Sequence, residues 1–148
     1  LEQLERILRF DAGHRSALEM QGWCYLGKGQ VAKAIEVLER YKSMTDQEYK
    51  GVTLLGYAYS KAGRIDDSRS CLAKLEERKK LNREEVLDMD FAVLHAGLGD
   101  MDKAFEYLER GVDAKLAGLF YLKDNRVLNE FRTDPRFKAL LAKAGLAS

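Results

Sequence analysis

The sequence predicts an all-α protein, built as a repeat array of antiparallel helix pairs and closed by a helical C-terminal cap. One ten-residue phrase occurs three times, with glycine first, an apolar residue third, a small residue sixth and leucine tenth. The copies begin at Gly29, Gly63 and Gly99, which lie 34 and then 36 residues apart. This period is typical of arrays whose units bury their apolar faces against one another. The single proline of the chain, Pro135, agrees with long uninterrupted helices.

Each glycine phrase follows an apolar stripe on the preceding helix, spaced for one face of a 3.6-residue helix. The stripe carries a small residue (Gly22, Gly56 and Ala92 in the three copies) that lets the next helix approach closely. The repeated glycine fits the turn, because helices commonly end at a residue in the left-handed conformation. The pattern predicts three helix pairs: Arg15–Lys28 with Val31–Ser43, Gln47–Lys61 with Ile65–Lys80, and Arg83–Leu98 with Met101–Asp113.

The two ends of the chain depart from this period. Leu1–Phe10 has the apolar spacing of a second helix, and we interpret it as the remnant of a preceding repeat in a longer protein. After Asp113 the period stops, and a short helical turn is expected around Val127–Phe131. Thr133 then precedes Asp134 and Pro135, which predicts a helix start with the threonine hydroxyl as its cap and a stop at Gly145. We expect this tail to cover the last apolar face of the array.

The composition argues against several functional classes. The chain has 25 basic and 24 acidic side chains, so no basic surplus indicates nucleic acid or an anionic membrane as a partner. No apolar run approaches the length of a membrane span. We therefore expect no nucleic-acid partner and no membrane partner for this chain.

Cysteine and histidine give no pattern for chemistry. Cys24 and Cys71 lack metal spacing and lie within helical patterns, which favours buried packing over a disulfide and makes a reducing, cytoplasmic location the default expectation. Neither His14 nor His95 has ligand spacing with another histidine or with the cysteines. The glycines follow the repeat and form no phosphate-binding loop. We expect no metal, no cofactor and no enzymatic activity.

These stripes resemble the tetratricopeptide repeat, a 34-residue helix–turn–helix with the signature W-x2-L-G-x2-Y followed by A-x3-F. The first copy keeps five signature positions: Gly22, Tyr25, Gly29, Ala34 and Leu38. Leu18, Val52 and Asp88 replace the tryptophan. The resemblance implies a right-handed superhelix forming one solenoid domain over residues 1–148. We divide it into the end of a truncated repeat (1–12), three repeats (15–48, 49–82 and 83–116) and a capping segment (117–148).

The tail also resembles a segment that closes tetratricopeptide arrays in many bacterial multidomain proteins, including winged-helix transcription regulators, adenylate cyclases and protein kinases. The matching residues are Tyr121 to Lys123, Leu128, Arg132 and Asp134 to Phe137. Val127, Asn129 and Glu130 depart from the usual phrase. The resemblance implies a bacterial array that belongs to a larger regulatory chain.

In this family the first helices of successive repeats line a concave groove that binds peptides or helices. The resemblance implies that these residues face the groove: Glu19, Trp23, Leu26, Lys50, Thr53, Tyr57, Ser60, Lys61, Met89 and Val93. Trp23, the only tryptophan, and Tyr57 are the leading anchors, and the alternative for each is packing in the core. Lys50 and Lys61 meet acidic groups or are solvated. The basic clamp of arrays that bind chaperone tails is absent.

Three functions remain open at this point. The leading hypothesis is a protein interaction module that binds a peptide or helix of a protein partner in the groove. The second is a structural element that assembles a homodimer or larger oligomer through the N-terminal helix or the groove. The third is an intramolecular regulatory domain of a larger enzyme or transcription regulator.

Overall fold

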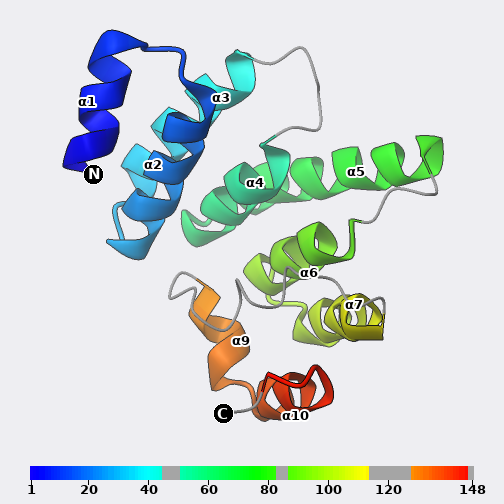
Figure 1. Cartoon of the computed structure of the whole chain (residues 1–148). Coiled ribbons are helices and arrows are strands. Elements are labelled where there is room, and N and C mark those ends of the chain that lie inside the picture. Colours follow the sequence, from blue (N-terminus) through cyan, green and yellow to red (C-terminus); the bar gives the residue numbers. More distant parts are fainter. Residues whose placement is uncertain (45–50, 83–86, 114–127, 147–148) are drawn as a thin grey trace.

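The computed structural model describes residues 1–44, 51–82, 87–113 and 128–146. Within these ranges all regular structure is helical (Figure 1). The helices are α1 (Glu2–Phe10), α2 (Arg15–Gly27), α3 (Val31–Ser43), α4 (Val52–Lys61), α5 (Ile65–Leu81), α6 (Asp88–Gly97), α7 (Met101–Asp113), α9 (Asn129–Thr133) and α10 (Pro135–Lys143).

The helices form stacked pairs, which confirms the predicted fold class. α2 packs on α3, α4 on α5 and α6 on α7, and α4 also contacts α3 and α6. Figure 1 shows the three pairs following one another along the chain, with α1 beside α2 at one end. α9 and α10 lie at the other end, where α10 packs on α7. The helix pair is therefore the unit of the fold, and α4 is the central first helix.

Two first helices are shorter than predicted. α4 begins at Val52, because Gly51 has a φ of 74° and cannot continue a right-handed helix. α6 begins at Asp88, after the non-helical Leu87. The predicted starts at Gln47 and Arg83 lie outside the described residues, but the predicted helices do not run through Gly51 or Leu87. Gly51 is the available signal for the start of α4, because glycine disfavours a helix interior. Leu87 gives no such signal, because it fits an apolar helical stripe.

The repeated glycines make the predicted left-handed turns. Gly29 has a φ of 69°, and its amide donates to the Leu26 carbonyl at 2.9 Å. The next amide, of Gln30, donates to the Tyr25 carbonyl at 2.9 Å. Gly63 and Gly99 have the same conformation and the same pair of hydrogen bonds. This pairing satisfies the last carbonyls of the first helix and turns the chain into the second helix.

Small residues allow the helices to approach as closely as the sequence predicts. A Cβ added at Gly56 of α4 would lie 2.7 Å from the Cys71 Cβ of α5 and 2.6 Å from the Leu94 Cδ2 of α6. A Cβ at Gly22 would lie 2.6 Å from the Leu38 Cδ2. The facing small residues on the second helices are fully buried: Ala34, Ser68 and Ala104.

Cys71 and His95 are buried in the core, and Cys24 is partly buried. Cys71 is a buried free thiol, and Cys24 is a half-buried one. His95 is 6% exposed and stacks on Tyr107, with ring centroids 5.6 Å apart. Burial lowers the pKa of His95, so the neutral imidazole packs in place of the usual repeat tyrosine. Among the described residues, no helix combines the length and apolarity needed to cross a bilayer.

The cap of α10 differs from the prediction in one residue. The Asp134 side chain accepts a hydrogen bond from the Arg136 amide at 2.9 Å, so Asp134 is the cap. The prediction that Thr133 caps this helix is wrong. Its hydroxyl contacts the carbonyls of Asn129 and Glu130, at 3.3 and 3.2 Å, and so belongs to the end of α9. The predicted stop at Gly145 is confirmed by a φ of 72°.

We expect Gly56→Ala to lower the free energy of unfolding by about 1–2 kcal/mol, because overpacking exceeds the roughly 1 kcal/mol that alanine gains in helix propensity. Urea denaturation followed by circular dichroism measures the change. Glu77→Ala, at an exposed position of α5, is the control and should stay within about 0.5 kcal/mol of wild type. A Gly56→Ala chain as stable as wild type would contradict the close approach.

Candidate functional site

The residues expected to face the groove come from α2, α4 and α6, and we call their shared surface the inner face. The structure brings five of these ten residues together around one apolar cluster. Leu26, Tyr57 and Val93 are buried within this cluster, and Trp23 and Met89 pack against it while part of each side chain remains exposed. At these positions the side chains of the inner face therefore also belong to the apolar core or pack against it. Lys50 lies outside the described residues.

The α2 part of the inner face remains open to solvent. Glu19 is exposed, and Trp23 is half-buried one turn later on the same helix. Leu26 is 8% exposed, so it forms the floor beneath them. An acidic side chain beside a half-buried indole is therefore what this part offers to a ligand.

Polar contacts tie α4 to its neighbours. The Thr53 hydroxyl donates to the Asp90 carboxylate of α6 at 2.7 Å. The Ser60 hydroxyl donates to the Tyr57 carbonyl at 2.7 Å. Both hydroxyls are thus occupied within the chain, and the Thr53–Asp90 bond joins α4 to α6, whereas the Ser60 bond lies within α4.

Tyr57 and Lys61 converge on one carboxylate oxygen of the C-terminal segment. The Tyr57 hydroxyl donates to Glu130 Oε1 at 2.8 Å, and Lys61 Nζ lies 2.9 Å from the same oxygen. Lys61 Nζ also lies 4.8 Å from the centre of the Tyr57 ring. Burial, followed by the charge of Glu130 and its hydrogen bond, raises the pKa of Tyr57. The hydroxyl therefore remains a proton donor.

Apolar contacts also hold α9 against the rest of the chain. Phe131 is fully buried and meets Phe105 of α7 edge-on, with ring centroids 5.8 Å apart. Leu128, directly before α9, is 2% exposed. Glu130 and Phe131 are adjacent in the sequence, so this short helix presents a charged anchor and an aromatic anchor side by side.

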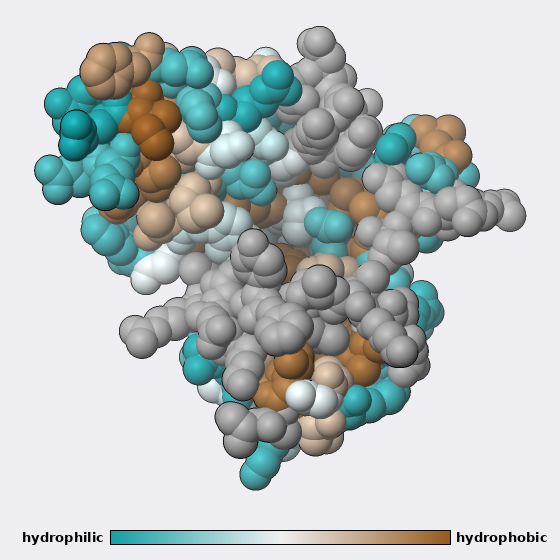
Figure 2. Space-filling view, in the orientation of Figure 1, coloured by the Kyte–Doolittle hydropathy of each residue, from teal (hydrophilic) through white to brown (hydrophobic). Residues whose placement is uncertain are grey.

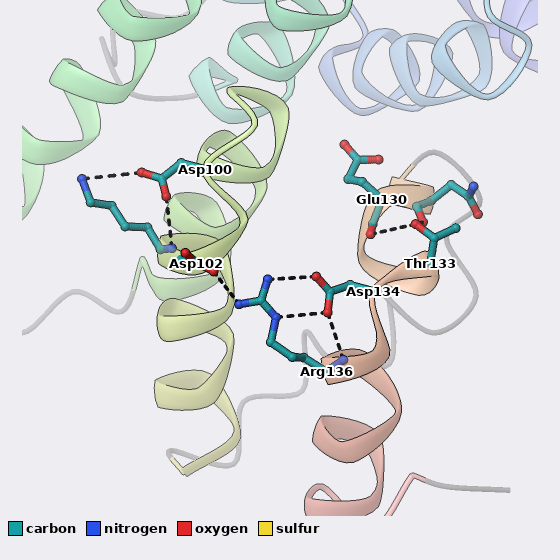
Figure 3. Close-up of polar contacts among 8 residues, drawn as sticks. Asp100, Asp102, Glu130, Thr133, Asp134 and Arg136 are labelled. Atoms are coloured by element: carbon teal, nitrogen blue, oxygen red, sulfur yellow. Dashed lines mark hydrogen bonds and ion pairs between the residues drawn. The ribbon is translucent and has the colours of Figure 1, made fainter.

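α10 has an anchor of its own on α7. Figure 3 shows Arg136 between Asp102 of α7 and Asp134, with bonds of 2.7 and 2.9 Å. The Arg136 guanidinium also lies 4.4 Å from the centre of the Phe105 ring. The hydrogen bond from Arg136 lowers the pKa of Asp134, which keeps this carboxylate charged. The attachment of α10 therefore does not involve Glu130.

The sequence predicted the α4 side of this contact but not its partner. Lys61 meets an acidic group, as one alternative proposed, and that group belongs to the same chain. Glu130 departs from the usual tail phrase, and this departure is the available signal in the sequence. Nothing in the sequence indicated that the tail reaches back to α4, two repeats earlier. Within the described residues, no cluster of His, Cys, Asp and Glu is arranged to hold a metal ion.

Comparison with protein families agrees with the helix pairs and their turns. Tetratricopeptide repeat models match residues 16–43 and residues 89–117. The chain therefore contains tetratricopeptide repeats. The first match covers α2 with α3, and the second includes α7 and most of α6. α4 and α5 lie between these matches and are joined by the same glycine turn. Comparisons with curated proteins and with solved structures found no match.

We expect Tyr57→Phe to lower the free energy of unfolding by about 1–2 kcal/mol, because it removes a hydrogen bond to a charged, largely covered carboxylate. Tyr59→Phe is a matched control, because the Tyr59 hydroxyl donates to the exposed Glu39 at the same 2.8 Å. That substitution should cost about 0.5 kcal/mol or less, as is usual for exposed contacts. Chemical denaturation of both variants measures the difference. An equal decrease in the free energy of unfolding for Tyr57→Phe and Tyr59→Phe would show that the Tyr57–Glu130 bond is worth no more than an exposed contact.

Proposed function

We propose that this tetratricopeptide-repeat array is a protein interaction module that binds a peptide or helix of a protein partner on its inner face. Tetratricopeptide repeats are in general protein–protein interaction modules. The observation that carries the proposal is the contact between α4 and α9. There the charged anchor Glu130 of a five-residue helix contacts α4, while its aromatic anchor Phe131 packs on Phe105 of α7. A surface that holds one short helix in this way has the chemistry to hold another.

The α2 part of the inner face supports the same proposal. Within the described residues, neither Glu19 nor Trp23 forms a side-chain hydrogen bond or ion pair, and both retain exposed surface. Tryptophan is prominent among the residues that dominate binding energy at protein interfaces. A partner helix lying along α2 would bury the rest of the Trp23 ring and bring a polar or basic group to Glu19.

Photo-crosslinking tests where a partner binds. We expect benzoylphenylalanine at position 19 to crosslink a partner from cell extract, because this position lies on the inner face of α2. The same residue at position 36, which replaces an exposed glutamate on the second helix α3, is the matched control and should crosslink poorly. Trp23→Ala should reduce capture about tenfold or more, as expected for a central aromatic anchor. Circular dichroism checks that this variant is folded.

Equal capture at positions 19 and 36 would contradict an inner-face site. Capture that Trp23→Ala leaves unchanged in a folded chain would show that the ring only packs against the core. Both readouts concern α2 and leave the contact between α4 and α9 unaltered.

A second candidate function is homo-oligomerisation through the N-terminal helix. Phe10 of α1 is 93% exposed and Ile7 is 40% exposed, and Met20 on the neighbouring α2 is 53% exposed. Figure 2 shows apolar residues over α1 and α2, at upper left, among hydrophilic ones. Apolar groups that gather on one surface are typical of protein contacts.

This second candidate predicts a dimer by light scattering at micromolar concentration and a monomer after Phe10→Glu, because the charge would be buried in the contact. Leu81→Glu is the control, since Leu81 is a 78% exposed apolar residue on α5, away from α1. The control should remain dimeric. A monomeric wild-type chain would contradict this candidate and leave the interaction module as the remaining proposal.

A further inference from the structure

The Tyr57–Lys61 pair is arranged to receive a carboxylate by contacts that do not depend on Glu130. The Tyr57 ring is fully buried in the core and positioned by it. Lys61 follows one turn later on α4 and lies over that ring at 4.8 Å, which is a favourable cation–π distance. Both donors then point to one oxygen, at 2.8 and 2.9 Å. The pair is thus a preformed site whose donors share one acceptor.

α9 fills this site without intrinsic helical stability. Its five residues form too short a helix to be stable alone. Leu128 before it and Asp134 after it lie outside the α-helix, with ψ angles of 47° and 128°. α10 is fixed to α7 separately through Arg136 and Asp102. The order of α9 therefore comes from its contacts, which include those of Glu130, of Phe131 and of the neighbouring α10, and α10 has further contacts on α7.

We propose that Tyr57 and Lys61 form a carboxylate-binding site that Glu130 occupies from within the chain, and that the partner displaces α9 with a short helix carrying glutamate followed by an aromatic residue. This inference rests on the proposed function. The partner must bring both groups, because Lys61 and the Tyr57 hydroxyl would otherwise lose their acceptor and Phe105 would lose its aromatic contact. The occupied state is the resting state of the inner face.

The covalent link gives α9 an advantage over any free segment. A tethered ligand competes at an effective concentration on the order of millimolar. The apparent affinity of a free segment equals its intrinsic affinity multiplied by the fraction of chains in which the site is empty. Weakening the contact of Glu130 should therefore strengthen the binding of a free segment that carries its own glutamate.

A labelled peptide tests this competition on the full chain. The probe is a fluorescein-labelled peptide of residues 127–134, VLNEFRTD, and fluorescence anisotropy measures its dissociation constant. We expect the peptide to bind the Glu130→Ala chain about tenfold or more tightly than wild type, because the internal competitor has lost its charged anchor. Glu109→Ala, at an exposed position of α7, removes a charge elsewhere and should leave the wild-type affinity unchanged.

Two further changes assign the gain to the site. A peptide with glutamine in place of its glutamate should bind the Glu130→Ala chain about tenfold more weakly, as for the loss of a charge-assisted bond. Adding Lys61→Ala to the Glu130→Ala chain should abolish the gain. Lys33→Ala, which removes a lysine 5.8 Å from the Tyr25 ring, is the matched control and should preserve it. Should Glu130→Ala not fold, Glu130→Gln keeps an acceptor for Tyr57 and should give a smaller gain.

Equal affinities for the wild-type and the Glu130-substituted chains would overturn the inference, as would a gain that survives Lys61→Ala. The outcome is separate from the test of the proposed function. Crosslinking at position 19 without a peptide gain would leave the interaction module standing and remove the carboxylate site. A peptide gain without crosslinking would support the site and remove the proposed role of the α2 surface.

Discussion

The distance between helices at the small residues of the stripes is the constraint on which the rest of this structure depends. At Gly56 no side chain separates α4 from Cys71 of α5 or from Leu94 of α6, so the central first helix contacts both neighbours directly. This close approach buries Tyr57, the next residue, in the core and fixes the direction of its hydroxyl. The same constraint that packs the array therefore positions a donor on its inner face.

Two tyrosine–glutamate contacts show how position in the repeat decides what a contact does. Tyr59 occupies the signature tyrosine position, and its hydroxyl donates to Glu39 of the preceding repeat at 2.8 Å. Tyr57, two residues earlier, makes an equally short bond to Glu130 of the C-terminal segment. The first contact joins neighbouring repeats in an exposed setting, while the second lies under a covering helix. The signature tyrosine thus joins neighbouring repeats, whereas the tyrosine two residues earlier contacts the C-terminal segment.

The local rules of the sequence predicted the helix pairs, because glycine turns and apolar stripes act over a few residues. They placed Gly29, Gly63 and Gly99 correctly and identified the α2, α3, α5 and α7 segments closely. They did not predict the contact between Lys61 and Glu130, which are 69 residues apart. No periodicity connects a repeat position with a residue of the cap, so only the folded chain reveals this pair. The cap residue Asp134 was missed for a local reason, because Thr133 and Asp134 both suit a helix start.

The stability of the array and the occupancy of the inner face are therefore linked, because both depend on the contacts of α9. Phe131 and Leu128 bury apolar surface that any release of α9 would expose, and this burial stabilises the array. A ligand that supplied only a carboxylate would satisfy Lys61 and the Tyr57 hydroxyl but would leave Phe105 uncovered beside the site. A ligand that supplied only an aromatic ring would leave the two donors without their acceptor. Under the proposed displacement, a segment that replaces both anchors together is therefore favoured over one that replaces a single anchor.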